Sequence, residues 1–190
     1  MRLTTTIIAA ATFALGGLVG AAALLAGHSS ADRGTSGALN PVWTEVQWPF
    51  PLDEWGKGKA FQCDAAHCGA AVNLYLRAKI GFCNCTTGVS DDEELERLSD
   101  FHLAGQQVAA LGAGRPIAVA WMKGRSRGYS IGGANRPGKS ALSVAFNDRC
   151  DAMVATAVTG HEQPAVVESA VIEFLNGKTV LRWAEVTLGL

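Results

Sequence analysis

The sequence lacks an excess of either charge, with 16 lysines and arginines against 17 aspartates and glutamates in 190 residues. A chain without a strong positive field has no general attraction for nucleic acid, so we expect no nucleic-acid partner. The five cysteines include no Cys-x-x-Cys pair, which is the spacing of thiol-exchange and covalent-haem motifs. These absences argue against nucleic-acid binding, thiol exchange and covalent haem, and leave no reason to expect a bound cofactor.

Charge is also missing from residues 7–27, which consist mostly of alanine, glycine and leucine. At about 1.5 Å per residue, a helix of this length measures roughly 30 Å and just spans a bilayer core. A signal peptide has a shorter apolar region and a small-x-small cleavage site, which Ser29 and Ala31 provide. We therefore expect residues 1–31 to be a cleaved signal peptide or a retained anchor that contacts the membrane through residues 7–27.

Both alternatives place the rest of the chain outside the cytosol, because the basic Arg2 keeps the N-terminus inside. The short basic start and Ala-rich run indicate a bacterial periplasm, with the protein soluble there or anchored to the inner membrane. Residues 32–41 have no periodicity and predict a flexible linker. Residues 42–190 are long enough for one extracytoplasmic domain with its own core.

Alternating apolar residues in this domain predict strands. The clearest is 71–80, with one face made of Val72, Leu74, Leu76, Ala78 and Ile80 and the opposite face made of Asn73, Tyr75, Arg77 and Lys79. Further strands are expected at 42–48, 129–131, 142–146, 153–158 and 179–187, and the uniformly apolar segment 117–122 is expected to be a central strand. Runs of strands with about two helices between them predict a single α+β domain with a largely antiparallel sheet.

The two helices are predicted from their end signals. Ser90 followed by Glu93 is a capping-box pattern, which places Ser90 at the N-cap of a short acidic helix. Pro164 suits the first residue of the second helix, and Gly177 suits its end. Glu168 is expected on the solvent face of that helix.

Four of the five cysteines lie within 23 residues, and outside the cytosol they are expected to oxidise. Because a Cys83–Cys85 bridge would close a very small ring, we expect each of these two to pair with Cys63 or Cys68. Cys150 is left over and is expected to be a buried free thiol. The alternative is a zinc or copper site, since thiolates and imidazoles are ligands for these metals; its candidate ligands are Cys63, His67, Cys68, Cys83 and Cys85.

Residues 133–140 match the pattern G-x-x-x-x-G-K-S and so resemble the phosphate-binding loop of P-loop nucleotide-binding proteins. The resemblance would make Lys139 and Ser140 the residues that contact phosphate and magnesium. The following residues, 141–146, alternate like a strand rather than starting a helix, and only 50 residues remain for the rest of a parallel sheet. We interpret the segment as a Gly/Pro turn between antiparallel strands and keep nucleotide binding as a remote alternative.

Acidic and basic residues are separated along the chain. Residues 91–100 carry six acids and one arginine, whereas residues 101–147 contain no acid at all. The basic side chains of the second segment could form a face for an anionic partner; the candidates are Lys123, Arg125, Arg127, Arg136 and Lys139. The alternative is that these residues lie on solvated hairpin loops.

Three tryptophans, Trp43, Trp48 and Trp55, are expected to pack the first strand onto the sheet, with a membrane-interface or partner contact as the alternative. The four histidines are scattered, so no catalytic constellation can be argued from spacing. The sequence therefore predicts an exported, disulfide-stabilised accessory or binding domain, rather than an enzyme. Its expected partner is a protein at the same membrane, in which case the chain would be a tethered subunit of a complex.

Overall fold

Strand β3 (Val72–Lys79) in the computed structural model of the chain confirms the clearest of the strand predictions. The structure describes residues 40–81, 84–105, 107–132 and 138–190. The predicted export segment, and the predicted linker as far as residue 39, lie outside the described residues. Within the described ranges, no helix has the length and apolar character needed to cross a membrane.

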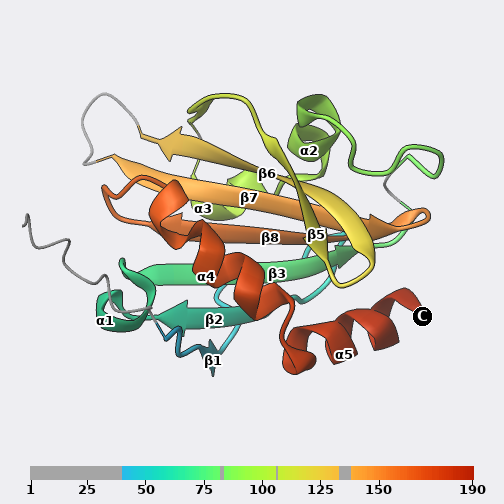
Figure 1. Cartoon of the computed structure of the whole chain (residues 1–190), viewed down its shortest axis with the longest axis horizontal. Helices are drawn as coiled ribbons and strands as arrows, with labels where there is room; N and C mark the ends of the chain where they lie inside the picture. The colour runs from blue at the N-terminus through green and yellow to red at the C-terminus, as the bar shows by residue number, and fades with distance from the viewer. Residues whose placement is uncertain (1–39, 82–83, 106, 133–137) are drawn as a thin grey trace, which may run out of the picture. The chain divides into compact units, whose positions relative to one another are not determined.

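The described residues form a single domain dominated by one eight-stranded antiparallel sheet (Figure 1). The strands besides β3 are β1 (Thr44–Val46), β2 (Lys59–Cys63), β4 (Val108–Ala110), β5 (Arg115–Val119), β6 (Met122–Ile131), β7 (Lys139–Asp148) and β8 (Asp151–Thr159). Their order is β1-β2-β3-β8-β7-β6-β4, and β5 pairs with the same edge of β6 that β4 uses. The predicted antiparallel α+β class is confirmed at this level.

Five short helices, rather than about two, occur among the described residues. They are α1 (Ala65–Cys68), α2 (Asp92–Leu98), α3 (Phe101–Ala104), α4 (Ala165–Leu175) and α5 (Lys178–Leu188). The N-cap of α2 is Asp91 and not Ser90, because the Asp91 carboxylate accepts a hydrogen bond from the Glu94 amide at 2.8 Å. Pro164 is the N-cap of α4, which confirms the predicted start to within one residue.

The prediction of a closing strand at 179–187 is wrong, since this segment is the helix α5. Its buried residues Val180, Ala184 and Leu188 are spaced by four, which fits a helical face as well as alternate positions of a strand. Leu181 and Trp183 on the intervening positions are also partly buried, which fits a helix but not a strand with one solvated face.

The prediction of a central strand at 117–122 is also wrong. Val119 ends β5 and Met122 starts β6, so the apolar run contains a two-residue hairpin turn at Ala120 and Trp121. Ala120 has a φ of 51°, which bends the chain back at this point. Val119 and Met122 are buried, whereas Trp121 is 55 % exposed.

The main core lies between one face of the sheet and the helices α4 and α5, which cover that face together (Figure 1). Leu74 and Leu76 of β3, Phe146 of β7 and Val171 of α4 are all fully buried there. The opposite face carries α2 and α3, and the buried Leu95 and Leu98 of α2 pack near Ala145 and Val154. Ile80, predicted on the apolar face of β3, lies beyond the strand and is 55 % exposed.

Candidate functional site

The cysteines form two disulfides, but the predicted pairing is wrong. Cys63 is bonded to Cys68, and Cys85 is bonded to Cys150, so Cys150 is not a free thiol. The physical reason is the length of β3, since eight residues at about 3.3 Å each separate its two ends by roughly 25 Å. Cys63 and Cys68 lie before the first end, whereas Cys85 lies beyond the second. Cys83 lies outside the described residues.

Each bridge is brought together by a local turn. Helix α1 between β2 and β3 returns the chain on itself, so that the Cα atoms of Cys63 and Cys68 are 6.1 Å apart. Cys150 lies in the β7–β8 turn, 4.3 Å from Cys85 between their Cα atoms. Arg149 in the same turn has a φ of 52°. The second bridge therefore fastens the loop after β3 to the neighbouring end of the sheet.

The alternative metal site is not supported by this arrangement. Bridged cysteines offer no thiolate, which removes Cys63, Cys68 and Cys85 as ligands. Nδ1 of His67 lies 2.7 Å from the Asp64 carboxylate, which is the N-cap of α1, and this hydrogen bond lowers the pKa of Asp64. Among the residues that the structure describes, no three or more His, Cys, Asp or Glu side chains are grouped as metal ligands would be.

The predicted anionic-partner residues do not form one patch. Lys123 and Lys139 lie at opposite ends of the β6–β7 ladder, opposite Asn147 and Ile131 respectively. Eight residues of strand put them about 26 Å apart. Arg136 lies outside the described residues.

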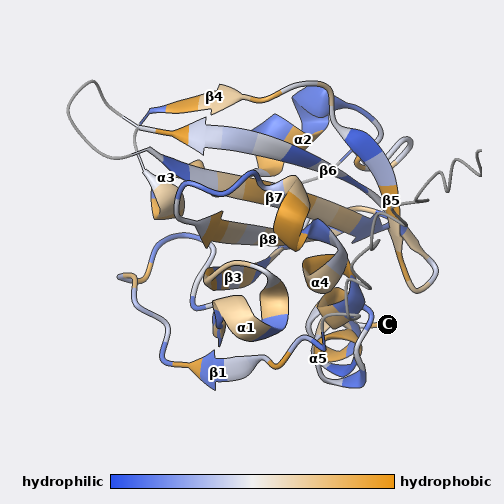
Figure 2. Cartoon of the chain, turned by 60° about the vertical axis from the view of Figure 1, so that its left-hand side comes forward, coloured by the Kyte–Doolittle hydropathy of each residue, from blue (hydrophilic) through white to orange (hydrophobic). Residues whose placement is uncertain are grey.

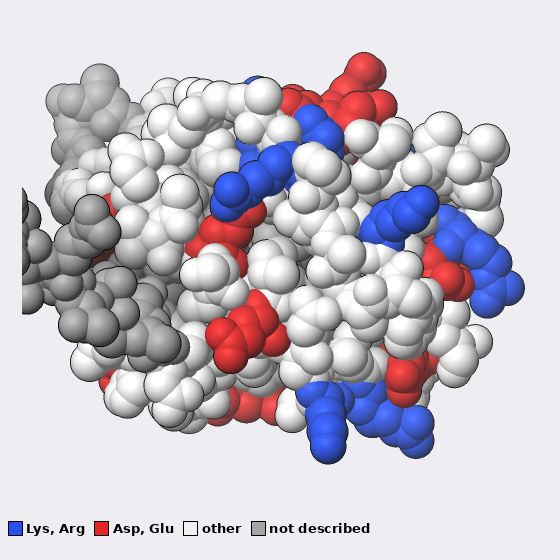
Figure 3. All heavy atoms as spheres, in the orientation of Figure 1, with Lys and Arg blue, Asp and Glu red and all other residues white. Residues whose placement is uncertain are grey.

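The two middle members of that set, Arg125 and Arg127, are paired with the acidic helix α2. Arg125 forms a short ion pair with Asp92, and Nη1 of Arg127 lies 2.7 Å from the Glu96 carboxylate. Hydrogen bonds from the Gly114 amide and from Arg125 lower the pKa of Asp92. Two arginines of the basic segment are therefore neutralised by acids of α2, and Figure 3 shows red and blue side chains interspersed.

The segment 133–140, which resembles a P-loop, joins the antiparallel partners β6 and β7. Its residues 133–137 lie outside the described ranges. Lys139 and Ser140 are the first two residues of β7 and not the start of a helix. The Ser140 amide donates a hydrogen bond to the Gly160 carbonyl at 3.0 Å. A phosphate-binding loop needs a helix here, so the strand contradicts the P-loop geometry.

Two charged residues on the polar face of β3, Arg77 and Lys79, are buried. Arg77 is 2 % exposed and Lys79 is 4 % exposed. The Asp100 carboxylate accepts hydrogen bonds from Nε and Nη2 of Arg77 at 3.0 and 2.7 Å, and Nζ of Lys79 lies 2.8 Å from it. Nη1 of Arg77 donates to Asp53, a contact that lowers the pKa of Asp53. These four charges form one ion-pair cluster, which is buried except at Asp53.

The segment 47–58 covers this cluster with aromatic rings. Trp48 is buried against Phe50 and Tyr75 and lies 5.9 Å from the Arg77 guanidinium, and Trp55 lies 5.1 Å from Nζ of Lys79. Trp43 stacks instead on Phe174 of α4, at the opposite face of the sheet. The three tryptophans therefore pack against the domain, as the first interpretation of them expected.

A cavity of about 230 Å³ lies where α4 meets the β4–β5 edge. Its floor includes Ser126, Gly128 and Leu142, and its walls include Leu111, Arg115 and Pro164. Glu168, predicted on the solvent face of α4, is 6 % exposed here. Its carboxylate accepts hydrogen bonds from Nε of Arg115 at 2.8 Å and from the Ser126 hydroxyl. The pair buries a charge that the helix pattern did not indicate.

Large apolar side chains are exposed at the tip of the β5–β6 hairpin and on α5. They are Trp121 on the tip, Val186 on α5 and Leu190 just after α5, with exposed fractions of 55 %, 67 % and 42 %, and we call them the hairpin–α5 surface. The side-chain oxygen of Asn176, between α4 and α5, accepts a hydrogen bond from the Ala120 amide at 2.8 Å. Figures 1 and 2 both show the hairpin tip beside α5, on which hydrophobic and hydrophilic residues alternate.

Comparison with known proteins adds no family to this description. No protein-family model matches the chain. No curated protein matches it either.

Proposed function

We propose that the chain is an exported, disulfide-stabilised accessory domain that docks on a protein partner at a membrane through the hairpin–α5 surface. The observation that carries the proposal is the exposure of Trp121 on the hairpin tip and of Val186 on α5, two elements that Figures 1 and 2 show near each other. Tryptophan is enriched among the residues that dominate protein interfaces, and exposed apolar side chains within a polar rim are typical of such surfaces.

The backbone next to Trp121 supports this proposal. Ala120 is a non-glycine residue in the left-handed region, which costs roughly 1–2 kcal/mol. In this conformation the Ala120 amide donates a hydrogen bond to the side-chain oxygen of Asn176. Strain that persists beside an exposed tryptophan is a reason to assign the hairpin tip a role beyond packing.

The charges around the surface favour a protein over a lipid headgroup layer. Arg149 and Arg182 are both 78 % exposed, but they lie close to Asp148 and Glu185 respectively. Cations that are neutralised nearby contribute little attraction to an anionic bilayer. An apolar centre within a polar rim suits a protein interface.

Export is supported by the two disulfides, because such bonds persist in oxidising compartments and are rare in the cytosol. Residues 1–31 then act as a signal peptide or as an anchor that holds the domain at the inner membrane of a bacterium. We favour a binding role over catalysis because the carboxylates of Glu168 and Asp100 are both engaged in ion pairs with arginines. Neither is available for proton transfer without breaking its pair.

Site-specific photo-crosslinking in the native host tests the proposal. A photoreactive residue at position 121 or 186 should give a crosslinked protein band that survives mild detergent extraction. The same residue at Leu52, which is 74 % exposed on the segment covering the opposite face, should not give this band. Val186→Asp should abolish co-purification of that band while changing the free energy of unfolding by no more than about 0.5 kcal/mol. A periplasmic monomer without a crosslink at either position would overturn the proposal.

A further inference from the structure

The cavity beside α4 exists because two strands share one edge of β6 and leave a gap between them. β5 pairs with β6 from Met122 to Ser126, and β4 pairs with it from Tyr129 to Ile131. Residues 127 and 128 lie between these two ladders, and the connecting residues 111–114 follow the gap. A Cβ atom at Gly128 would lie only 3.2 Å from Pro164, so this glycine lets the start of α4 approach the gap closely.

The cavity is too small for a large metabolite. Its volume of about 230 Å³ lies below the range of roughly 300–1,000 Å³ that is usual for pockets with drug-sized ligands. Leu111, Leu142 and Pro164 supply apolar wall, and Arg115, Gln163 and Glu168 supply polar groups. A ligand that fits must therefore combine a short apolar body with one polar group.

The sign of that polar group follows from the Arg115–Glu168 pair. Nε of Arg115 donates to one oxygen of Glu168, and Nη2 is paired with the other. The Ser126 hydroxyl also donates to Glu168, so the carboxylate is already occupied by donors from the chain. A cationic ligand would have to compete with Arg115 for these oxygens. The cavity therefore disfavours a cation.

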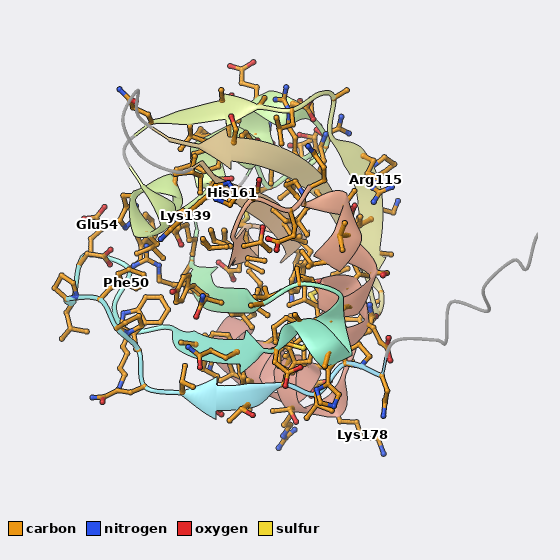
Figure 4. All side chains as sticks on the ribbon, turned by 90° about the vertical axis from the view of Figure 1, so that its left-hand side faces the viewer. Phe50, Glu54, Arg115, Lys139, His161 and Lys178 are labelled. Atoms are coloured by element: carbon orange, nitrogen blue, oxygen red, sulfur yellow. A yellow bond between two sulfur atoms is a disulfide. The ribbon has the colours of Figure 1, made fainter. Side chains whose placement is uncertain are left out.

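The guanidinium of Arg115 keeps a second edge for an anion. Among the described residues, Nη1 makes no hydrogen bond or ion pair, and Nη2 has one further hydrogen to donate. The planar guanidinium can thus hold Glu168 on one edge and bind a second carboxylate on the other, with two parallel hydrogen bonds. The Arg115 side chain is 62 % exposed, and Figure 4 shows Arg115 at the rim of the molecule.

We propose that this cavity binds a small ligand with one carboxylate, which the free edge of Arg115 holds while Leu111, Leu142 and Pro164 contact its apolar part. The start of α4, an eleven-residue helix, has no side-chain cap and already holds the Glu168 carboxylate in its first turn, where the helix dipole favours negative charge. Glu168 acts as a positioning residue, because its two oxygens pair with Nε and Nη2 of Arg115 and so fix the plane of the guanidinium. The proposal does not depend on the hairpin–α5 surface.

The carboxylate could belong to a free short-chain acid or to the C-terminal residue of a peptide. Both would place the same group on Arg115. A peptide would also extend past the cavity to the outer edge of β4, which is uncharged and exposed at Ala109 and Ala110. Figure 2 shows β4 as a hydrophobic strand at the rim of the sheet. Edge strands of this kind accept extended chains.

Amide chemical shifts of the ¹⁵N-labelled, oxidised full chain test the proposal, with propionate, N-acetylalanine and acetyl-trialanine as probes. Because Arg115 is solvated, binding should saturate with a Kd on the order of 1 mM. The amides of Gln163, Ala165 and Gly112 should shift, and N-acetylalaninamide, which lacks the charge, should leave them unchanged. Equal binding of propionate and acetyl-trialanine assigns the site to free acids. Tighter peptide binding with added shifts at β4 assigns it to C-termini.

Two variants and one matched control complete the test. Arg115→Gln should weaken binding by at least about tenfold, since it removes the charged bidentate donor. Because it also leaves Glu168 without its arginine, Ala165→Phe serves as a second variant that fills the cavity from an exposed helix position and should abolish binding. Arg182→Gln removes an exposed cation from α5 and should leave the Kd unchanged. Absence of saturable shifts, or equal binding by Ala165→Phe or by the neutral amide, would overturn the proposal.

Discussion

The two disulfides should stabilise the domain by different amounts, because they close loops of different length. A cross-link lowers the entropy of the unfolded chain by an amount that grows with the logarithm of the loop length. Cys63 and Cys68 are separated by 5 residues, and Cys85 and Cys150 by 65. At 25 °C these separations correspond to about 2 and about 4 kcal/mol of stabilisation. Together they make up a large part of the roughly 5–15 kcal/mol that is typical of a whole domain.

Urea unfolding with and without reductant measures the stabilisation that each disulfide contributes, if one variant is made for each bridge. The Cys85→Ala/Cys150→Ala variant keeps the Cys63–Cys68 bridge, which closes the short loop. Reduction of this variant should lower the free energy of unfolding by about 2 kcal/mol. In Cys63→Ala/Cys68→Ala reduction should lower it by about 4 kcal/mol. Comparing the oxidised and reduced forms of one variant cancels the packing change that alanine introduces, which matters because Cys63 and Cys68 are buried.

Thiol counting supplies the control for this experiment. Four of the five cysteines are bridged, so the denatured but unreduced wild-type chain should react with one equivalent of alkylating agent. Equal losses for the two variants, or the larger loss for the short loop, would refute the loop-entropy reasoning. Four or five reactive thiols in protein taken directly from cells would refute the assignment to an oxidising compartment.

Two further predictions concern the charge cluster on β3. Arg77→Met should lower the free energy of unfolding by about 3–5 kcal/mol, because it removes one partner from a buried ion pair with Asp100; urea unfolding beside an Arg182→Met control measures this, and a loss below about 1 kcal/mol would contradict it. Since Arg77 lowers the folded-state pKa of Asp53, the unfolded chain binds more protons near pH 4, and stability should fall as the pH drops below about 4. Asp53→Asn should flatten this decline in thermal unfolding between pH 6 and 2.5, and an unchanged slope would contradict the coupling.

The regular strands could be predicted from the sequence because their period is short and local. In β3 every second residue faces the main core, and the segments 142–146 and 153–158 lie within β7 and β8 as expected. The hairpin tip and α5 could not be distinguished in this way. An apolar run does not reveal a turn at its centre, and residues spaced by four satisfy a strand and a helix alike.

The buried charges were missed for a different reason. Lys79 and Glu168 look like solvent-facing residues in their own segments, and only partners far along the chain bury them. Arg115 lies 53 residues from Glu168, and Asp100 lies 23 residues from Arg77. A local pattern contains no signal for such pairs. The two cations Arg77 and Lys79 on one strand were at most a sign that buried acidic partners could exist elsewhere in the chain.

The sequence by itself determined the class of the domain, the period of its principal strands and the chemistry of its cysteines as bridge formers. These properties depend on each residue and its near neighbours. The tertiary structure alone decided which cysteines meet, that α2 neutralises the basic strand β6, and that Arg115 and Glu168 line one cavity. Those outcomes depend on strand length and sheet order, which bring together side chains from distant parts of the chain.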